Sequence, residues 1–177
     1  MRKRPLLVPL LVAGCTTAEP QGGPPMALVD ATGQSIGTVR AWQTAGGVTF
    51  RIDAAGLAHG VHAIHVHSVG RCEGPEFKSA GAHWNPTGKM HGLSNPAGPH
   101  AGDLPNVEVA ANGVLGKAVT LAGAQLTGPS GDPHVLLDAD GAALVIHAAA
   151  DDNLTDPSGN SGARIACAVI QPVAEIR

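Results

Sequence analysis

The chain contains no tyrosine, and only two phenylalanines and two tryptophans occur among its 177 residues. It also lacks a basic stripe: 14 acidic residues outnumber 11 basic ones, which gives a formal net charge of −3. Proteins that bind nucleic acids need clustered positive charge and commonly carry aromatic side chains for base stacking. The composition therefore argues against nucleic acid as a partner.

A long hydrophobic run is missing too, because the most apolar early segment extends only from Leu6 to Val12. A membrane-spanning helix needs about 20 apolar residues. This segment follows a basic start and precedes small residues and Cys15, so residues 1–14 are predicted to be a secretory signal. The small residues before Cys15 resemble the lipobox of bacterial lipoproteins, which implies cleavage before Cys15 and a lipid anchor on its sulfur. The alternative is an ordinary signal peptide in which Cys15 is incidental.

We accordingly expect an exported protein in the periplasm or at the cell surface, with the membrane contacted only through Cys15. Cleavage would remove three basic side chains and leave 8 basic against 14 acidic residues, a net charge of −6. If Cys15 is lipidated, Cys72 and Cys167 remain as a distant pair, and in an oxidising compartment such a pair favours a disulfide. The alternatives are two buried free thiols or two metal thiolates.

No segment shows a convincing helical period with caps, and there is no internal repeat. After a Pro/Gly-rich tether at 15–25, short β-like runs alternate with Gly, Pro, Asn and Asp. Val48, Phe50 and Ile52 alternate with polar residues, as in a half-buried strand. The pattern predicts one all-β domain over 26–177, an antiparallel sandwich or barrel. Among its predicted strands are residues 35–41, 48–53, 62–69, 106–110, 117–121, 143–147 and 164–170.

Two long loops, at 70–102 and 151–162, interrupt this rhythm, and long loops in compact domains are usually functional. His65 and His67 lie two residues apart on a predicted strand, so their rings would share one face of the sheet. Five further metal-competent side chains follow them, namely His83, His91, His100, Asp103 and His147.

Imidazole nitrogen suits copper and zinc, and a single carboxylate fits a tetrahedral zinc site. One candidate zinc set consists of His83, His91, His100 and Asp103. A second, all-nitrogen set consists of His65, His67 and His147. His83 could serve both ions through its two ring nitrogens, although the sequence does not require this bridge.

Each of these residues also has a simpler interpretation. A single histidine in an apolar strand is more often a hydrogen-bonded structural residue, which is the role expected for His59, His62 and His134. Asp151 is either a solvated loop charge or an acceptor for ligand N–H groups. Arg164 is either a surface residue or a group that steers an anion. Seven metal-competent groups together nevertheless favour metal binding.

Several segments closely resemble the Cu/Zn superoxide dismutases, especially the exported bacterial ones. The matching segments are HVH at 65–67, SAGAHWNP at 79–86, KMHG at 89–92, HAGDLPN at 100–106, LLDADG at 136–141, ALVIH at 143–147 and GNSGARIAC at 159–167. The match as a whole covers roughly residues 26–172, and in order and spacing together the segments are highly specific.

The resemblance implies an eight-stranded antiparallel Greek-key β-barrel or sandwich, immunoglobulin-like in architecture, with a long metal-binding loop. It implies dismutation of two superoxide anions and two protons to dioxygen and hydrogen peroxide by Cu(II)/Cu(I) cycling, with a structural zinc. The implied copper ligands are His65, His67, His83 and His147. The implied zinc ligands are His83, His91, His100 and Asp103.

The resemblance also implies roles around the metals. Asp151 would accept a hydrogen bond from one ligand of each metal, and Arg164 would guide superoxide to copper. His83 would bridge the metals and carry a proton, so that His83 and Arg164 are the catalytic residues. Cys72 and Cys167 would form the intrasubunit disulfide.

The chain departs from the family pattern in the second loop, which is shorter than in the animal enzymes and has neither Lys nor Glu. The additional steering charges of the family have no counterpart there, and Trp84 stands where Phe is common. The rival hypothesis is a non-enzymatic copper or zinc binder on the same fold. A zinc hydrolase is disfavoured because no His-Glu helix motif is present. The sequence is compatible with a monomer and with a homodimer.

Overall fold

The computed structural model describes residues 22–171, so the predicted signal segment and Cys15 lie outside the described part of the chain. Nine strands are present there: β1 (Met26–Asp30), β2 (Ser35–Thr44), β3 (Gly47–Ala54), β4 (Gly60–His62), β5 (Ile64–His67), β6 (Val107–Val109), β7 (Leu115–Ala122), β8 (Ala142–His147) and β9 (Arg164–Ile170). The helix within residues 22–171 is the short 3₁₀ helix η1 (Lys78–Ala80). It is too short to cross a membrane.

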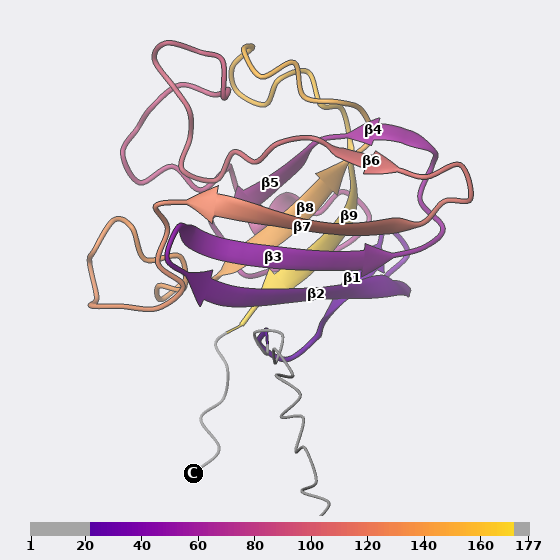
Figure 1. Ribbon diagram of the computed structural model, residues 1–177, viewed down its shortest axis with the longest axis horizontal. Coiled ribbons are helices and arrows are strands. Elements are labelled where there is room, and N and C mark those ends of the chain that lie inside the picture. Colours follow the sequence, from indigo (N-terminus) through magenta and orange to yellow (C-terminus); the bar gives the residue numbers. More distant parts are fainter. Residues whose placement is uncertain (1–21, 172–177) are drawn as a thin grey trace, which may run out of the picture.

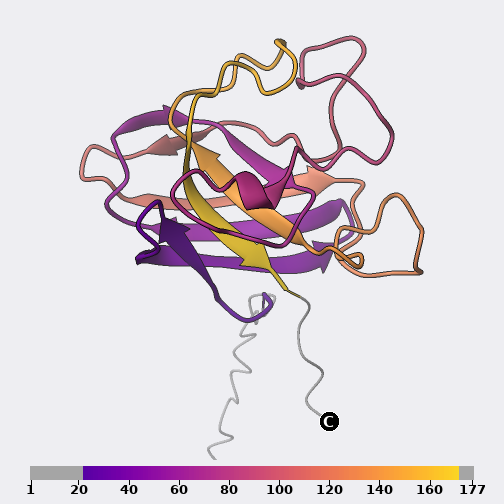
Figure 2. The same cartoon turned by 180° about the vertical axis from the view of Figure 1, so that it is seen from behind.

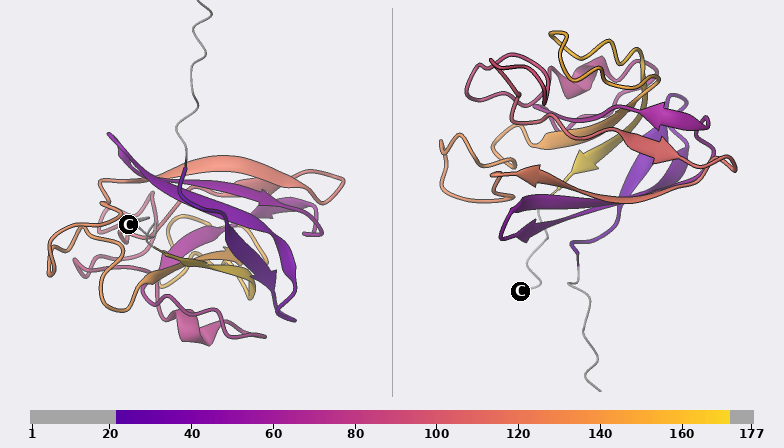
Figure 3. Two further views of the ribbon diagram at one scale, coloured as in Figure 1. Left: turned by 90° about the horizontal axis from the view of Figure 1, so that it is seen from below. Right: turned by 45° about the horizontal axis from the view of Figure 1, so that its top comes forward.

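Seven strands form one antiparallel sheet in the order β5-β8-β9-β1-β2-β3-β7, and β4 pairs with β6 in a separate two-stranded sheet. The large sheet curls over, so that β2, β3 and β7 lie opposite β8 and β9 (Figures 1 and 3). Neighbours such as β9 and β1 are far apart in the sequence, as a Greek-key connection requires. The predicted all-β, antiparallel Greek-key barrel is confirmed.

The predicted strand at 62–69 is divided in the structure, because Ala63 separates β4 from β5. The Ala63 N–H donates to the Ala149 carbonyl, and the Ala63 carbonyl accepts from the His147 N–H. On one side of Ala63 the chain pairs with β6, and on the other it pairs with β8. The described chain therefore has nine strands where eight were predicted.

The core lies between the two layers of the curled sheet. In β3, Phe50 and Ile52 are fully buried, whereas Arg51 and Asp53 point outward and form an ion pair of 2.6 Å between Nη2 and Oδ1. Burial of a side chain as large as Phe contributes about 1.5–3 kcal/mol to folding. The alternation predicted for residues 48–53 is thus the alternation between core and solvent.

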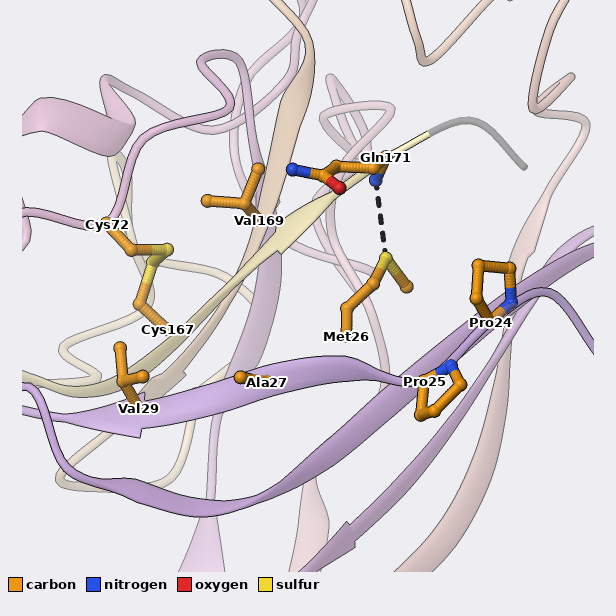
Figure 4. Close-up of a pocket in the computed structure, with 9 residues that line it drawn as sticks. All are labelled: Pro24, Pro25, Met26, Ala27, Val29, Cys72, Cys167, Val169 and Gln171. Atoms are coloured by element: carbon orange, nitrogen blue, oxygen red, sulfur yellow. Dashed lines mark hydrogen bonds between the residues drawn. A yellow bond between two sulfur atoms is a disulfide. The ribbon is translucent and has the colours of Figure 1, made fainter. Parts of the chain in front are cut away.

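A disulfide joins Cys72, in the loop after β5, to Cys167 in β9, with the two Cα atoms 5.7 Å apart. Figure 4 shows this bond beside a groove along β1 and β9, where the Gln171 N–H donates to the Met26 sulfur. Cys167 is fully buried in a small apolar cluster that includes Phe77. The predicted disulfide is confirmed, and both alternatives, free thiols and metal thiolates, are wrong.

Both long loops lie at the same end of the barrel, beside each other in both opposite views (Figures 1 and 2). The Ser94 N–H donates to the Asn153 carbonyl at 2.9 Å. The Asn95 side-chain amide donates to the Leu154 carbonyl at 3.2 Å. The loops at 70–102 and 151–162, distant in the sequence, are thus hydrogen-bonded to each other at this end of the barrel.

Candidate metal centre

The first long loop reaches the metal centre by pairing with β5, which is the edge strand of the large sheet. The Trp84 N–H donates to the Val66 carbonyl, and the Val66 N–H donates to the Gly102 carbonyl. A side chain at 102 would collide with the Val66 carbonyl oxygen, so this close approach requires glycine. The pairing brings His83 opposite His67 and Asp103 opposite His65.

One group of donor atoms consists of imidazole nitrogens that lie within 4.8 Å of one another, contributed by His65, His67, His83 and His147. Three of these nitrogens are buried and have no hydrogen-bond partner: His65 Nδ1, His67 Nε2 and His147 Nε2. An unpaired buried polar atom is costly, and three of them facing one another indicate a ligand that the protein side chains do not supply. An all-imidazole set of this kind fits copper.

The opposite nitrogen of each of these rings is hydrogen-bonded within the protein. His65 Nε2 donates to Asp151 Oδ2 at 2.8 Å, and His67 Nδ1 donates to the Gly81 carbonyl at 3.0 Å. His147 Nδ1 lies 3.1 Å from Ser161 Oγ. Such partners fix the tautomer and orientation of a ligand ring, so that its other nitrogen is free for the metal.

The environment also keeps these rings neutral. Burial lowers the pKa of His67 to about 2 and that of His147 to about 3. Burial lowers the pKa of His65 to about 4, although the Asp151 carboxylate acts in the opposite direction. Neutral imidazole is the form that coordinates a metal, so these three rings are ready to bind without losing a proton at neutral pH.

A second group converges on Asp103 Oδ1. His83 Nδ1 and His91 Nδ1 each lie 3.0 Å from this oxygen, and His100 Nδ1 lies 3.3 Å from it. His100 Nδ1 is also 3.3 Å from His83 Nδ1. A tetrahedral zinc ion, with ligands at about 2.0–2.1 Å, holds its ligand atoms about 3.3–3.4 Å apart. These four atom pairs lie near that spacing, and the donor types are those that zinc takes. The donor atoms that all lie within 4.8 Å of one another are, however, those of His65, His83, His91 and Asp103, without His100.

The two groups share His83 and are in contact through His65. The His65 and His83 ring centroids are 4.0 Å apart, and His65 also lies within 4.8 Å of the donor atoms of His91 and Asp103. The set His65, His67, His83 and His147 is called the copper group below, and the set His83, His91, His100 and Asp103 the zinc group. We assign His65 to the copper group, because Asp151 holds its Nε2 and its Nδ1 is one of the unpartnered nitrogens.

Asp151 connects the two groups. Its Oδ2 accepts from His65 Nε2 at 2.8 Å, and its Oδ1 accepts from His91 Nε2 at 3.0 Å. Burial alone would lower the pKa of His91, but the carboxylates of Asp103 and Asp151 raise it to about 9. A metal that binds His91 must therefore displace a proton at neutral pH. The solvated-charge interpretation of Asp151 is wrong, since the residue is only 4% exposed.

The sequence of the chain matches a known family. The family model described as copper/zinc superoxide dismutase (SODC) matches residues 35–170. The chain belongs to the Cu/Zn superoxide dismutase family. It is 43% identical over 150 residues to a Cu-Zn superoxide dismutase of Aquifex aeolicus, a match that covers 81% of this chain and 84% of the relative.

Other relatives agree with this assignment. A Cu-Zn superoxide dismutase of Caulobacter vibrioides is 43% identical over 140 residues, covering 78% of this chain and 80% of the relative. The crystal structure of a SOD-like protein from Bacillus subtilis superposes with a TM-score of 0.79 at 41% identity, covering 84% of this chain and 99% of that one. The protein is thus a Cu/Zn superoxide dismutase by family, and its two histidine-rich groups fit copper and zinc.

In this superoxide dismutase, Arg164 begins β9 directly opposite His147 of β8. Its guanidinium donates to the carbonyls of Phe77 and Gly81, each at 2.7 Å. Burial lowers its pKa from the usual value, and an arginine guanidinium stays charged in proteins. Arg164 also lines a cavity together with Glu76 and Lys78. The guanidinium is therefore held rigidly beside the copper group and faces a solvent-accessible opening.

Three histidines fall outside both groups. His62 is buried, and its two ring nitrogens lie 2.8 Å from the His147 carbonyl and 2.9 Å from the Ala58 carbonyl. His59 and His134 are exposed, and His134 lies 2.9 Å from Asp132. His62 thus has the hydrogen-bonded structural role expected of it, whereas His59 and His134 lie on the surface.

The sequence did not reveal two residues that support the centre, Gly81 and Asn106. The Gly81 carbonyl accepts from both His67 and Arg164, and a backbone carbonyl leaves no signal in a sequence. Asn106 exchanges hydrogen bonds with the backbone of Asp151, each at 2.9 Å. Asn106 is the last residue of the family-matching segment 100–106, but neither that match nor its place three residues after Asp103 indicated a contact with Asp151.

Proposed function

We propose that the protein dismutates superoxide, converting two superoxide anions and two protons to dioxygen and hydrogen peroxide. The observation that carries this proposal is the set of three unpartnered, buried imidazole nitrogens facing one another beside a fixed guanidinium. A small anion that approached the copper group would meet the positive charge of Arg164, next to His147. Superoxide has the matching size and charge.

The residues present fit both metals. Copper would be held by His65, His67, His83 and His147, and when bound it would supply one-electron chemistry through Cu(II) and Cu(I). A structural zinc would be held by His83, His91, His100 and Asp103. His83 would engage zinc through Nδ1, the atom that faces Asp103, which leaves its Nε2 for the copper side. That Nε2 is the atom that would carry a proton to the reduced substrate.

The charge distribution gives Arg164 a specific task. The chain is negative overall and superoxide is an anion, so net charge opposes the encounter. A positive group in a low-dielectric opening can focus the local field despite the net charge. Two carbonyl contacts hold the guanidinium in place, so it can guide the anion without first having to be ordered.

Replacement of His83 tests the shared-ligand arrangement. His83→Ala should abolish dismutation and reduce the occupancy of both metals, because both groups lose a donor. The control is His134→Ala, which removes an exposed histidine outside both groups. Loss of zinc alone, with copper content and activity retained, would contradict a bridging role for His83.

A non-enzymatic metal binder on the same fold is the second candidate, because one close structural relative is described only as SOD-like. Against it stand the complete ligand set and Arg164, all of which this chain retains. Metal occupancy without dismutation would favour this alternative.

We also propose that the protein is exported and anchored by a lipid on Cys15, with residues 26–177 forming the enzyme domain. Support comes only from the basic and apolar start followed by small residues and cysteine. The mass of the mature protein tests this proposal. Cleavage before Cys15 with an added diacylglycerol, absent in Cys15→Ser, is expected, whereas an unmodified Cys15 would contradict it.

A further inference from the structure

The second loop contributes an acid that contacts two ligands of the zinc group. Asp156 Oδ1 accepts a hydrogen bond from the backbone N–H of His91 at 2.7 Å. The same oxygen lies 3.8 Å from His100 Nε2, the ring nitrogen that points away from the zinc group. Asp156 is partly shielded, with 38% of its side chain exposed, and His100 is nearly buried at 9%.

The nitrogen of a ligand ring that points away from the metal is usually hydrogen-bonded. A carboxylate there orients the ring and makes its other nitrogen a more basic metal ligand. For His91 this partner is Asp151, at 3.0 Å from Nε2. For His100, no carboxylate of residues 22–171 other than Asp156 lies within 4.0 Å of Nε2. A separation of 3.8 Å is too long for a hydrogen bond but short enough for the carboxylate charge to attract the polar N–H of the His100 ring.

We propose that Asp156 is a positioning residue of the zinc site, which fixes His91 through its backbone and His100 through its ring and thereby slows zinc release. This inference rests on the zinc site of the proposed function. Because Asp156 lies in the second loop, it also makes zinc retention depend on the docking of that loop against the first.

The neighbouring Asp152 provides a matched control. Its Oδ1 accepts from the N–H groups of Leu154 and Thr155 at 2.9 and 2.8 Å, and its Oδ2 accepts from Asn160. It therefore shapes the same loop and carries the same charge, but none of these contacts reaches a zinc ligand. Asp152→Ala would loosen the loop without removing the carboxylate that faces His91 and His100.

The rate of zinc release to a chromogenic chelator, measured on the zinc- and copper-loaded protein, tests the proposal. Asp156→Ala should release zinc faster, by about the 10- to 100-fold typical for loss of an outer partner of a metal ligand. Asp156→Asn keeps an acceptor for the His91 N–H but loses the charge that faces His100, so its rate should be intermediate. Asp152→Ala should release zinc more slowly than Asp156→Ala does.

Cobalt substituted for zinc gives a second measurement, because its visible absorption reports the ligand geometry. The cobalt spectrum should change in Asp156→Ala and not in Asp152→Ala. Zinc release from Asp156→Ala at the wild-type rate would overturn the proposal, and so would an equal acceleration in Asp152→Ala.

Wild-type zinc content and dismutation, measured on the same preparations, separate the two claims. If the wild type holds zinc and dismutates, and Asp156→Ala releases zinc at the wild-type rate, only the role of Asp156 is overturned. A wild type that holds zinc without dismutating overturns the proposed function and leaves the zinc-release comparison valid. A wild type that binds no zinc overturns both.

Discussion

The carboxylate of Asp151 joins the two metal groups, so its removal should weaken the binding of both metals. Its two oxygens accept from His65 Nε2 at 2.8 Å and from His91 Nε2 at 3.0 Å, and its side chain is 1% exposed. Asp151→Ala leaves both imidazole N–H groups without an acceptor. Asp151→Asn supplies one acceptor oxygen, and its amide nitrogen would face the other imidazole N–H.

The size of the effect follows from these two contacts. Loss of an outer hydrogen-bond partner typically costs 10- to 100-fold in metal affinity, which corresponds to about 1.4–2.7 kcal/mol for each metal. Asp151→Ala should therefore show a loss in this range for copper and also for zinc. Asp151→Asn should retain most of the affinity at one site only, the one whose ligand still finds the amide oxygen.

Competition with chelators selective for each metal measures both affinities on one preparation. Asp132→Ala is the control, because Asp132 is a surface acid that contacts His134, outside both groups. If Asp151→Ala weakens only one metal, or neither, the carboxylate does not couple the two sites and the reasoning is refuted.

Three further predictions concern the disulfide and the cavity lined by Glu76, Lys78 and Arg164, which is called the opening here. Arg164→Ala should lower kcat/KM and weaken its dependence on salt while metal content stays constant; an unchanged rate and salt dependence would contradict a steering role. Replacement of Cys72 and Cys167 by serine should lower the free energy of unfolding by about 4–5 kcal/mol in denaturant titrations, because their separation of 95 residues closes a long loop. A loss of well under 1 kcal/mol would show that the unfolded chain gains little freedom from the double substitution. Glu76→Gln removes the acid that lies 2.7 Å from Lys78 at the opening, so it should raise the rate at low ionic strength and not at high ionic strength. The same acceleration at both ionic strengths would argue against an electrostatic origin.

Local patterns in the sequence were sufficient for those parts of the structure that depend on short-range geometry. His65 and His67 share a face because alternate residues of a strand do, and both belong to the copper group. Phe50 and Ile52 are buried for the same reason. The turn residues around the long loops likewise marked them as separate from the sheet.

Features that depend on distant pairing were not visible in the sequence. The break at Ala63 exists because Ala149 and His147 hydrogen-bond to it, more than eighty residues further along the chain. The contact of Asp156 with His91 depends on how the two loops dock, which no local signal specifies. The bridging position of Asp151 was expected from the family resemblance, and the residues alone left it open.

The most direct test of the central claim is a parallel measurement of metal content and superoxide dismutation on residues 16–177 loaded with copper and zinc. The two ligand groups predict one copper and one zinc per chain together with fast, cyanide-sensitive dismutation. Full occupancy of both metals without dismutation would contradict the enzymatic account and favour a metal-binding role.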